Sequence, residues 1–156
     1  KDQVKSAVVD VRRLVYELRP PALDELGLIG AIREKARQFE LDGTLSITVE
    51  APPTMPPLRA ALEVAAYRIV TEAMTNVVRH AGATTCAVRL TVNGAVVIII
   101  QDDGKGLPEN LRTGVGIRSM AERAAELGGT CTLNSSPQGG TLVCARLPYT
   151  TKETTL

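Results

Sequence analysis

The run Ala95-Val-Val-Ile-Ile-Ile100, followed by Gln101-Asp-Asp-Gly-Lys-Gly106, decides the fold of this chain. A continuously apolar and mostly β-branched run predicts a central strand that is covered on both faces. The acidic turn after it predicts a ligand crevice, because open α/β sheets bind their ligands at the carboxyl ends of strands. The alternative is an ordinary turn, since Asp-Asp-Gly is common turn chemistry.

The segments around this strand alternate between strand and helix patterns. Residues 84–92 alternate apolar and polar side chains, and Asn93-Gly94 after them is a strong hairpin signal. Residues 58–81 carry apolar side chains nearly all round a helix, which predicts that this helix is largely buried. The remaining predicted helices are 1–18, 28–41 and 117–127, and the remaining predicted strands are 44–50, 130–135 and 141–147. The predicted fold class is therefore α/β, a two-layer α/β sandwich with a mixed, mainly antiparallel sheet, preceded by one amphipathic helix.

The composition is that of an ordinary globular protein, with 44% hydrophobic and 22% charged residues. Its 18 basic and 17 acidic residues give a net charge of +1, so the overall charge predicts neither a nucleic-acid partner nor a membrane contact. The cysteines have no metal-ligand spacing and lie in apolar segments, which predicts buried thiols in a reducing compartment: Cys86, Cys131 and Cys144. No run is long enough to span a membrane, and no secretory signal precedes the first helix. We therefore expect a cytoplasmic chain, and its start at Lys1 within a helical pattern predicts that it is a piece of a longer protein.

Polar side chains share one stripe of the predicted long helix. Glu72, Asn76 and His80 recur at i, i+4 and i+8, and Arg79 lies beside them. An Asn oxygen suits Mg²⁺, a Glu can orient a water or act as a base, and Arg79 or His80 can meet phosphate charge. A stripe that faces solvent is the alternative, and for His80 alone it would be the better interpretation. For the trio together, the pattern predicts a binding site.

Two glycine-bearing loops complete the predicted site. A carboxylate at Asp102 can accept a hydrogen bond from an exocyclic amine such as that of adenine, while Gly104 and Gly106 leave room for a flat base. Gly114-Val-Gly116 precedes the start of a helix, where backbone N–H groups favour phosphate, and the segment between the loops could close as a lid. A dinucleotide fingerprint and a P-loop are both absent, and the acidic spacing does not fit an EF-hand. The loops and the stripe together predict a pocket for a purine and a metal-bound triphosphate.

These motifs resemble the ATP-binding (Bergerat-type) fold shared by gyrases, Hsp90 chaperones, sensor histidine kinases and mismatch-repair ATPases. Within it, the chain resembles sensor histidine kinases of the nitrate-sensor and DesK-like class. The resemblance covers about residues 8 to 148. The matching motifs are Glu72-x-x-x-Asn76-x-x-Arg79-His80-Ala (the N box), Asp102-Asp-Gly-Lys-Gly106 and Gly114-Val-Gly-Ile-Arg-Ser-Met120 (the glycine boxes), and Gly139-Gly-Thr-Leu-Val143 (the terminal hairpin).

The resemblance implies a role for each matching residue. Asn76 would bind Mg²⁺, Asp102 would accept a hydrogen bond from the adenine amine, and Glu72 would be the catalytic residue, as a base or as a positioning group. The remaining implied ATP contacts are Arg79, His80, Gly104 and Gly106 (against the base), Gly114 and Gly116 (at the phosphates), and Thr141 (at the adenine end). The implied ligands are ATP or ADP with Mg²⁺, and the implied partners are a dimerisation and phosphotransfer domain, which makes the parent a homodimer, and a response regulator.

The resemblance also predicts a domain organisation. Residues 1–22 resemble the last helix of a dimerisation and phosphotransfer domain, 23–150 form the ATP-binding catalytic domain, and 151–156 are a tail. The family phosphorylates a histidine on the first dimerisation helix, but the single histidine here is His80 in the N box. We therefore expect this chain to bind ATP without phosphorylating itself.

Two other functions remain open at this point. One is a serine kinase of the anti-sigma type, which shares the fold and a similar N box, although the segment from Leu18 to Leu28 favours a sensor kinase. The other is a non-catalytic module used for nucleotide binding or dimer contacts, although the presence of Glu72, Asn76 and Asp102 argues against it.

Overall fold

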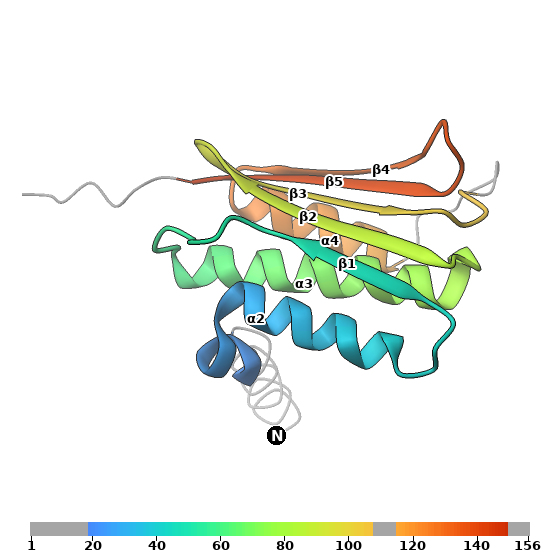
Figure 1. Ribbon diagram of the computed structural model, residues 1–156. Coiled ribbons are helices and arrows are strands. Elements are labelled where there is room, and N and C mark those ends of the chain that lie inside the picture. Colours follow the sequence, from blue (N-terminus) through green and yellow to red (C-terminus); the bar gives the residue numbers. More distant parts are fainter. Residues whose placement is uncertain (1–18, 108–114, 150–156) are drawn as a thin grey trace, which may run out of the picture.

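The computed structural model describes residues 19–107 and 115–149. The helix predicted over 1–18, most of the predicted lid with Gly114, and the predicted tail lie outside these ranges. The described elements, in chain order, are α2 (Pro21–Glu40), β1 (Ser46–Glu50), α3 (Ala60–Asn76), η1 (Val77–Ala81), β2 (Thr85–Val92), β3 (Ala95–Asp102), α4 (Val115–Glu126), β4 (Thr130–Ser135) and β5 (Thr141–Pro148) (Figure 1).

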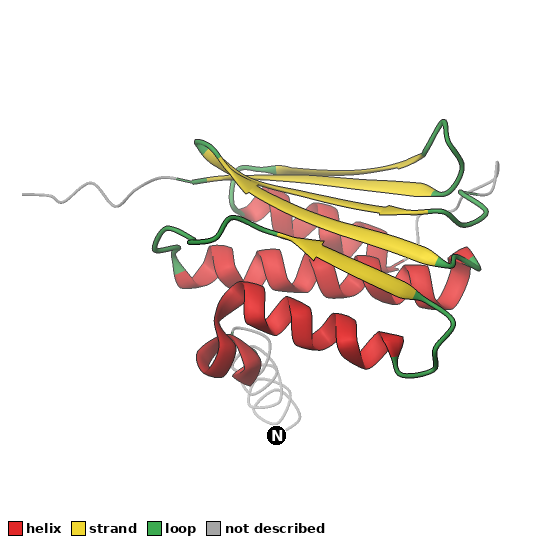
Figure 2. Cartoon of the chain, viewed as in Figure 1, coloured by secondary structure: helices red, strands yellow, loops and turns green. Residues whose placement is uncertain are grey.

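The strands form one five-stranded sheet in the order β1-β2-β3-β5-β4. β1 pairs with β2 in parallel, and the other three pairs are antiparallel. The helices α2, α3 and α4 all lie against the same face of the sheet, so that the molecule has one helical layer and one sheet layer (Figures 1 and 2). The predicted two-layer sandwich with a mixed sheet is confirmed. Its hairpin at Asn93-Gly94 also forms as predicted, with Gly94 at φ 67°.

The core lies between α3 and the sheet. Ile69, Val70 and Met74 of α3 are fully buried, as are Ile98 of β3 and Ile32 of α2. The long predicted helix is therefore buried as its pattern indicated, because it has apolar side chains toward α2 and α4 as well as toward the sheet.

The prediction that β3 is covered on both faces is wrong. Val96, Ile98 and Ile100 point into the core, but Val97 and Ile99 alternate with them and are only half-buried on the opposite face. No described helix covers that face (Figure 1). A continuously apolar strand here means a central position in the sheet, where neighbouring strands and their side chains shield the outer face.

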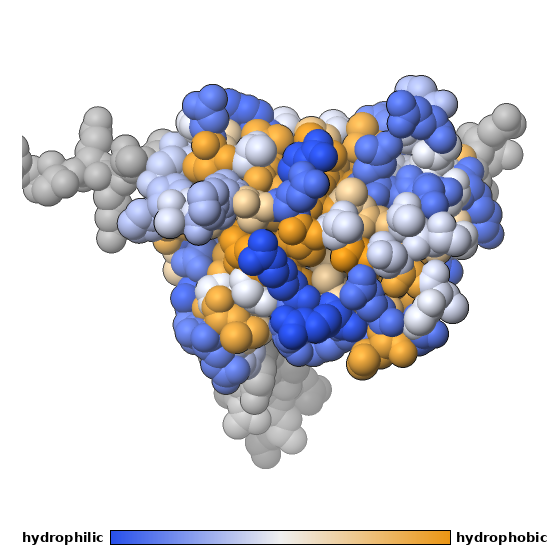
Figure 3. Space-filling model, in the orientation of Figure 1, coloured by the Kyte–Doolittle hydropathy of each residue, from blue (hydrophilic) through white to orange (hydrophobic). Residues whose placement is uncertain are grey.

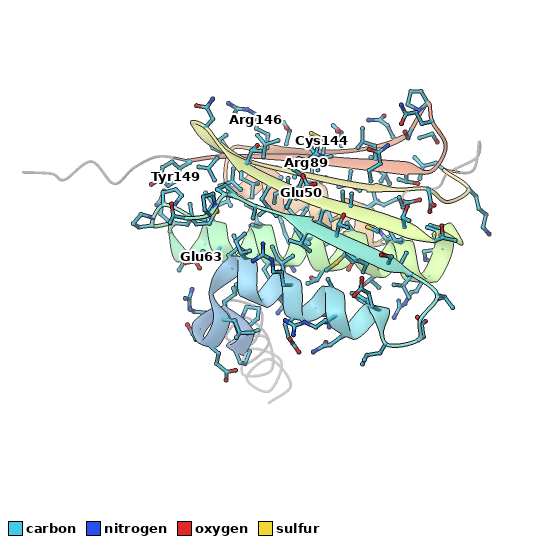
Figure 4. The ribbon with its side chains drawn as sticks, in the orientation of Figure 1. Glu50, Glu63, Arg89, Cys144, Arg146 and Tyr149 are labelled. Carbon is cyan, nitrogen blue, oxygen red and sulfur yellow. The ribbon has the colours of Figure 1, made fainter. Side chains whose placement is uncertain are left out.

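Polar and charged side chains surround this outer apolar strip. Arg89 of β2 donates to Glu50 of β1 at 2.9 Å, and both side chains are exposed. Figure 4 shows this pair on adjacent strands, and Cys144 and Arg146 on the outer side of β5. An exposed pair of this kind contributes roughly 0–1 kcal/mol, so the stability of the sheet comes from its inner face.

The helix α2 differs from its predicted range of 28–41, because it begins at Pro21. Proline is favoured in the first helical turn, and Leu23 is buried beneath this added turn. The helix is interrupted at Gly27, whose φ of 71° and ψ of 175° are not helical. Within the added segment before residue 28, Gly27 is thus the residue that departs from helical geometry. An ion pair links Arg19, just before the helix, to Asp24 in its first turn.

Large exposed hydrophobic side chains are few in the described part of the chain. They are Leu26, Leu41 and Val78, which belong to the start of α2, the residue after it, and η1. Figure 3 shows hydrophilic and hydrophobic residues interspersed over one side of the molecule. Scattered apolar residues of this kind are normal on a protein surface. Within the described ranges, no helix has both the length and the apolar character needed to cross a bilayer.

Candidate functional site

A cavity of about 670 Å³ opens where α3 passes into η1 and where β3 ends. Its walls come from α3 and η1, the loop after β3, the start of α4, and β4 and β5. These segments meet at the right-hand end of the molecule in Figure 1. The volume is within the range of about 300–1,000 Å³ that is usual for small-molecule sites.

One wall is the polar stripe predicted from the sequence. Glu72, Asn76, Arg79 and His80 all line the cavity. Glu72 and Asn76 are half-buried, which argues against a stripe that simply faces solvent, whereas Arg79 and His80 are exposed at the rim. Along this wall, the Asn76 amide therefore lies between the half-buried Glu72 carboxylate and the exposed Arg79 and His80 side chains.

The helix changes its winding at this wall. The backbone of Val77–Ala81 is a π-helix, which continues α3 without a break and ends at Gly82 with φ 60°. Val77 and Ala81 are buried, and this anchors the wider turn to the core. Short π-helical segments inside helices are rare and are frequently found at functional sites. Here the π-helical turn carries Arg79 and His80, which stand at the cavity rim.

The facing wall carries Asp102, the one buried charged side chain in the described part of the chain, at 5% exposure. The Gly104 N–H donates to its Oδ1 at 2.8 Å, and no described residue donates to its Oδ2. Asp102 lines the cavity. A buried carboxylate that lines a cavity and has one oxygen without a donor among the described residues requires a donor from water or from a ligand.

The glycines that were predicted to contact the nucleotide do not all line the cavity. Gly106 and Gly116 line the cavity together with Thr141, whereas Gly104 is not among the lining residues. A Cβ at Gly104 would overlap the Ala81 carbonyl oxygen and lie 2.8 Å from its carbon. Close packing of the loop against η1, rather than space for a base, therefore accounts for glycine at this position.

Gly116 brings the start of α4 against Glu72. A Cβ at Gly116 would lie 2.9 Å from the Glu72 Cδ, so any larger residue would push α4 and α3 apart or displace the carboxylate. A carboxylate close to a helix N-terminus is also favoured by the helix dipole.

Several lining residues were not predicted from the sequence. The apolar floor comes from Ile100 and Val143, which are direct partners across β3 and β5. Lys105 and Leu107 add to the wall after β3. The alternation of the strands identifies Ile100 and Val143 as inward-facing, but only their position at the strand ends places them in a cavity.

Gly140 was also missed as a site residue, although it does not line the cavity itself. Its φ is 84°, and a Cβ there would overlap the Asp102 carbonyl oxygen and lie 2.6 Å from its carbon. The β4–β5 turn therefore packs directly on the backbone of Asp102. The Gly139-Gly140 pair was a recognisable turn signal, but its contact with Asp102 is not local in sequence.

Comparison with known proteins agrees with this geometry. Residues 61–151 match the family described as histidine kinase-, DNA gyrase B-, and HSP90-like ATPase, and the chain belongs to this family. The predicted family resemblance is confirmed.

The similar curated proteins are sensor histidine kinases. The sensor histidine kinase MctS of Rhizobium johnstonii is 35% identical over 153 residues, which are 94% of this chain and 33% of that protein. The oxygen sensor histidine kinase NreB of Staphylococcus carnosus is 32% identical over 145 residues, which are 90% of this chain and 42% of that protein. This chain thus spans about a third to two-fifths of the length of these relatives.

A solved structure matches most of the chain and most of its own length. The ATP binding domain of PrrB from Mycobacterium tuberculosis is 27% identical with a TM-score of 0.63, covering 81% of this chain and 94% of that one. The histidine kinase domain of a blue-light activated histidine kinase from Erythrobacter litoralis shares the fold, with a TM-score of 0.66 at 21% identity over 78% of this chain and 60% of that one.

Proposed function

We propose that this chain binds Mg²⁺-ATP as the catalytic domain of a two-component sensor histidine kinase. In the parent enzyme, the γ-phosphate would pass to a histidine of a dimerisation and phosphotransfer domain in a homodimer, and then to an aspartate of a response regulator. The observation that carries the proposal is the buried Asp102 carboxylate, which lines a nucleotide-sized cavity together with Asn76 and receives no hydrogen bond at its Oδ2 from the described residues. The similar proteins named above are sensor histidine kinases, which favours this function over an anti-sigma-type serine kinase.

The residues divide the cavity into two ends. Asp102 would accept a hydrogen bond from the adenine amine, beside Gly106 and Thr141, with Ile100 and Val143 as the apolar surface beneath the base. These apolar walls exclude water from the base and leave Asp102 as the group that recognises its amine. The proposed domain structure is 1–22 for the dimerisation helix, 23–150 for the ATP-binding domain and 151–156 for the tail, in the cytoplasm where ATP is available.

The phosphates would lie toward the N box. Arg79 and His80 offer positive charge or donors at the rim, and Gly116 lines the cavity at the start of α4, where a backbone N–H would donate to a phosphate oxygen. The Asn76 oxygen would hold Mg²⁺, which usually takes one or two protein ligands together with phosphate oxygens and water. The bound metal would neutralise phosphate charge during transfer. Glu72, which also lines the cavity, would orient or deprotonate the attacking group.

Calorimetric titration of ADP and Mg²⁺ into the chain tests the proposal. Asp102→Asn removes the charge from the proposed hydrogen bond, so affinity should fall about 10- to 100-fold, the equivalent of roughly 1.5–3 kcal/mol. Asp42→Asn is the matched control, because Asp42 is an exposed loop carboxylate bonded only to Thr44 within the described ranges. Removing Mg²⁺ with a chelator should weaken ADP binding and leave adenosine binding unchanged.

A second measurement separates the kinase classes. The chain is incubated with ATP and a separately supplied phosphotransfer domain, and the phosphorylated product is treated with acid. A histidine kinase gives an acid-labile product, whereas an acid-stable phosphoserine would contradict the proposal. Absence of any nucleotide binding by the unmodified chain would reject it altogether.

A further inference from the structure

Asp103, the second residue of the acidic turn, holds a set of contacts that the proposed nucleotide site does not use. Its carboxylate accepts hydrogen bonds from the Thr84 N–H at 2.8 Å, the Thr84 hydroxyl at 2.7 Å and the Thr85 N–H at 2.9 Å. Its own N–H donates to the Thr85 carbonyl at 3.3 Å. Asp103 is exposed and does not line the nucleotide cavity, so neither burial nor ligand contact explains this arrangement.

These contacts join the loop after β3 to the segment that leads from η1 into β2, at a place outside the cavity lining. Thr84 follows the end of η1 by a few residues, and Thr85 begins β2. On the other side of Asp103, the Lys105 N–H donates to the Ala81 carbonyl at 2.9 Å. The loop after Asp102 is thus hydrogen-bonded at two points, Asp103 and Lys105, to the end of η1 and the segment that follows it. Gly104 packs against Ala81 between them.

We propose that Asp103 is a positioning residue that fixes Asp102 relative to the N-box wall and so keeps the adenine end of the cavity preformed. This inference rests on the proposed function. The hydrogen-bond donors around Asp103 hold its pKa well below the ordinary value, so the carboxylate stays ionised wherever the domain works. Only a carboxylate can accept from all of these donors at once, because an amide has a single acceptor oxygen.

Loss of the Asp103 hydrogen bonds should affect nucleotide binding more than it affects the stability of the fold. Asp103 and its partners are exposed, so their loss should change the global stability little. Their effect on binding is larger, because a loop that must be ordered by the ligand lowers the apparent affinity. Nucleotide affinity and thermal stability should therefore respond separately.

The experiment compares variants on each side of the contact. Asp103→Ala removes all of the carboxylate bonds, Thr84→Val removes only the hydroxyl bond, and Thr84→Ser keeps it. Asp42→Asn is the matched control, because Asp42 also accepts from the N–H and the hydroxyl of a threonine, Thr44, in an exposed turn outside the cavity lining. Affinities for adenosine and for ADP with Mg²⁺ are measured by calorimetry, and exchange of the Lys105 amide proton is followed by NMR.

We expect Asp103→Ala to weaken both ligands by about 5- to 30-fold, the equivalent of one or two hydrogen bonds, and to speed exchange at Lys105. The affinity of Thr84→Val should lie between the affinities of wild type and Asp103→Ala. Thr84→Ser and Asp42→Asn should bind both ligands as tightly as wild type does. Unchanged affinity in both Asp103→Ala and Thr84→Val, with wild type binding normally, would overturn this inference and leave the proposed function standing. Thr84→Val keeps the test decisive if Asp103→Ala does not fold. Wild-type protein that binds no nucleotide would overturn both.

Discussion

Replacing Gly140 with alanine should damage the molecule far more than the same change at Gly139. Both glycines have positive φ, 93° at Gly139 and 84° at Gly140. A Cβ at Gly139 meets no atom within 4 Å, whereas a Cβ at Gly140 would overlap the Asp102 carbonyl oxygen and lie 3.0 Å from the Asp102 Oδ1. The two variants share the backbone strain and differ only in the overlap.

The magnitudes follow from these two terms. An alanine in the left-handed region costs about 1–2 kcal/mol, which is the whole expected effect of Gly139→Ala. The overlap at Gly140 falls on the backbone of Asp102, which pairs with Cys86 of β2 at the end of β3, so relief requires the turn and the strand end to separate. Overpacking of this kind adds about 1–3 kcal/mol, giving about 2–5 kcal/mol for Gly140→Ala.

Urea unfolding followed by circular dichroism measures both values, since the midpoint shifts with stability while the slope stays constant. Calorimetry with ADP then tests the link to the site, because displacing Asp102 should weaken binding in Gly140→Ala and not in Gly139→Ala. Equal destabilisation of the two variants would refute the reasoning, because it would mean that the contact with Asp102 carries no energy.

Two further predictions concern titratable groups. Burial, with a smaller effect from the Asp102 charge, raises the pKa of Cys86 to about 12. At pH 8 this thiol should therefore resist iodoacetamide in the native state and react once urea unfolds the chain, as measured by mass spectrometry of the labelled peptides. Rapid labelling of Cys86 in the native state would contradict its buried position. The pKa of Asp103 is lowered in the folded state, so the stability that its carboxylate contributes is complete above its unfolded pKa and declines as the pH falls below about 4. Because Asp103 is exposed, the stability difference between wild type and Asp103→Asn in urea should be small at pH 5 and should narrow further toward pH 2.5. A difference that stays constant over this range would show that the charge is not involved.

Most of the fold was predictable because its signals are local. The β-branched run before Asp102 and the Asn93-Gly94 turn specify a hairpin within a few residues of each other, and the structure forms it there. Likewise, the stripe of Glu72, Asn76 and His80 follows from helical spacing alone, and its members share one cavity wall. The start of α2 was mispredicted, because proline is favoured in the first turn of a helix and buried Leu23 favours helix at this position.

Helical spacing and turn chemistry thus specify the elements of this chain and its ATPase-family motifs, since each depends on neighbours along the backbone. The cavity, by contrast, is formed by contacts between segments that are distant in sequence. These contacts are Gly104 with Ala81, Gly140 with Asp102, and Asp103 with Thr84. No periodicity reports these contacts, because they arise only when the sheet order β1-β2-β3-β5-β4 brings the two hairpins and the end of α3 together. The half-buried outer face of β3 has the same origin, since an apolar run cannot say which of its faces the helices will cover.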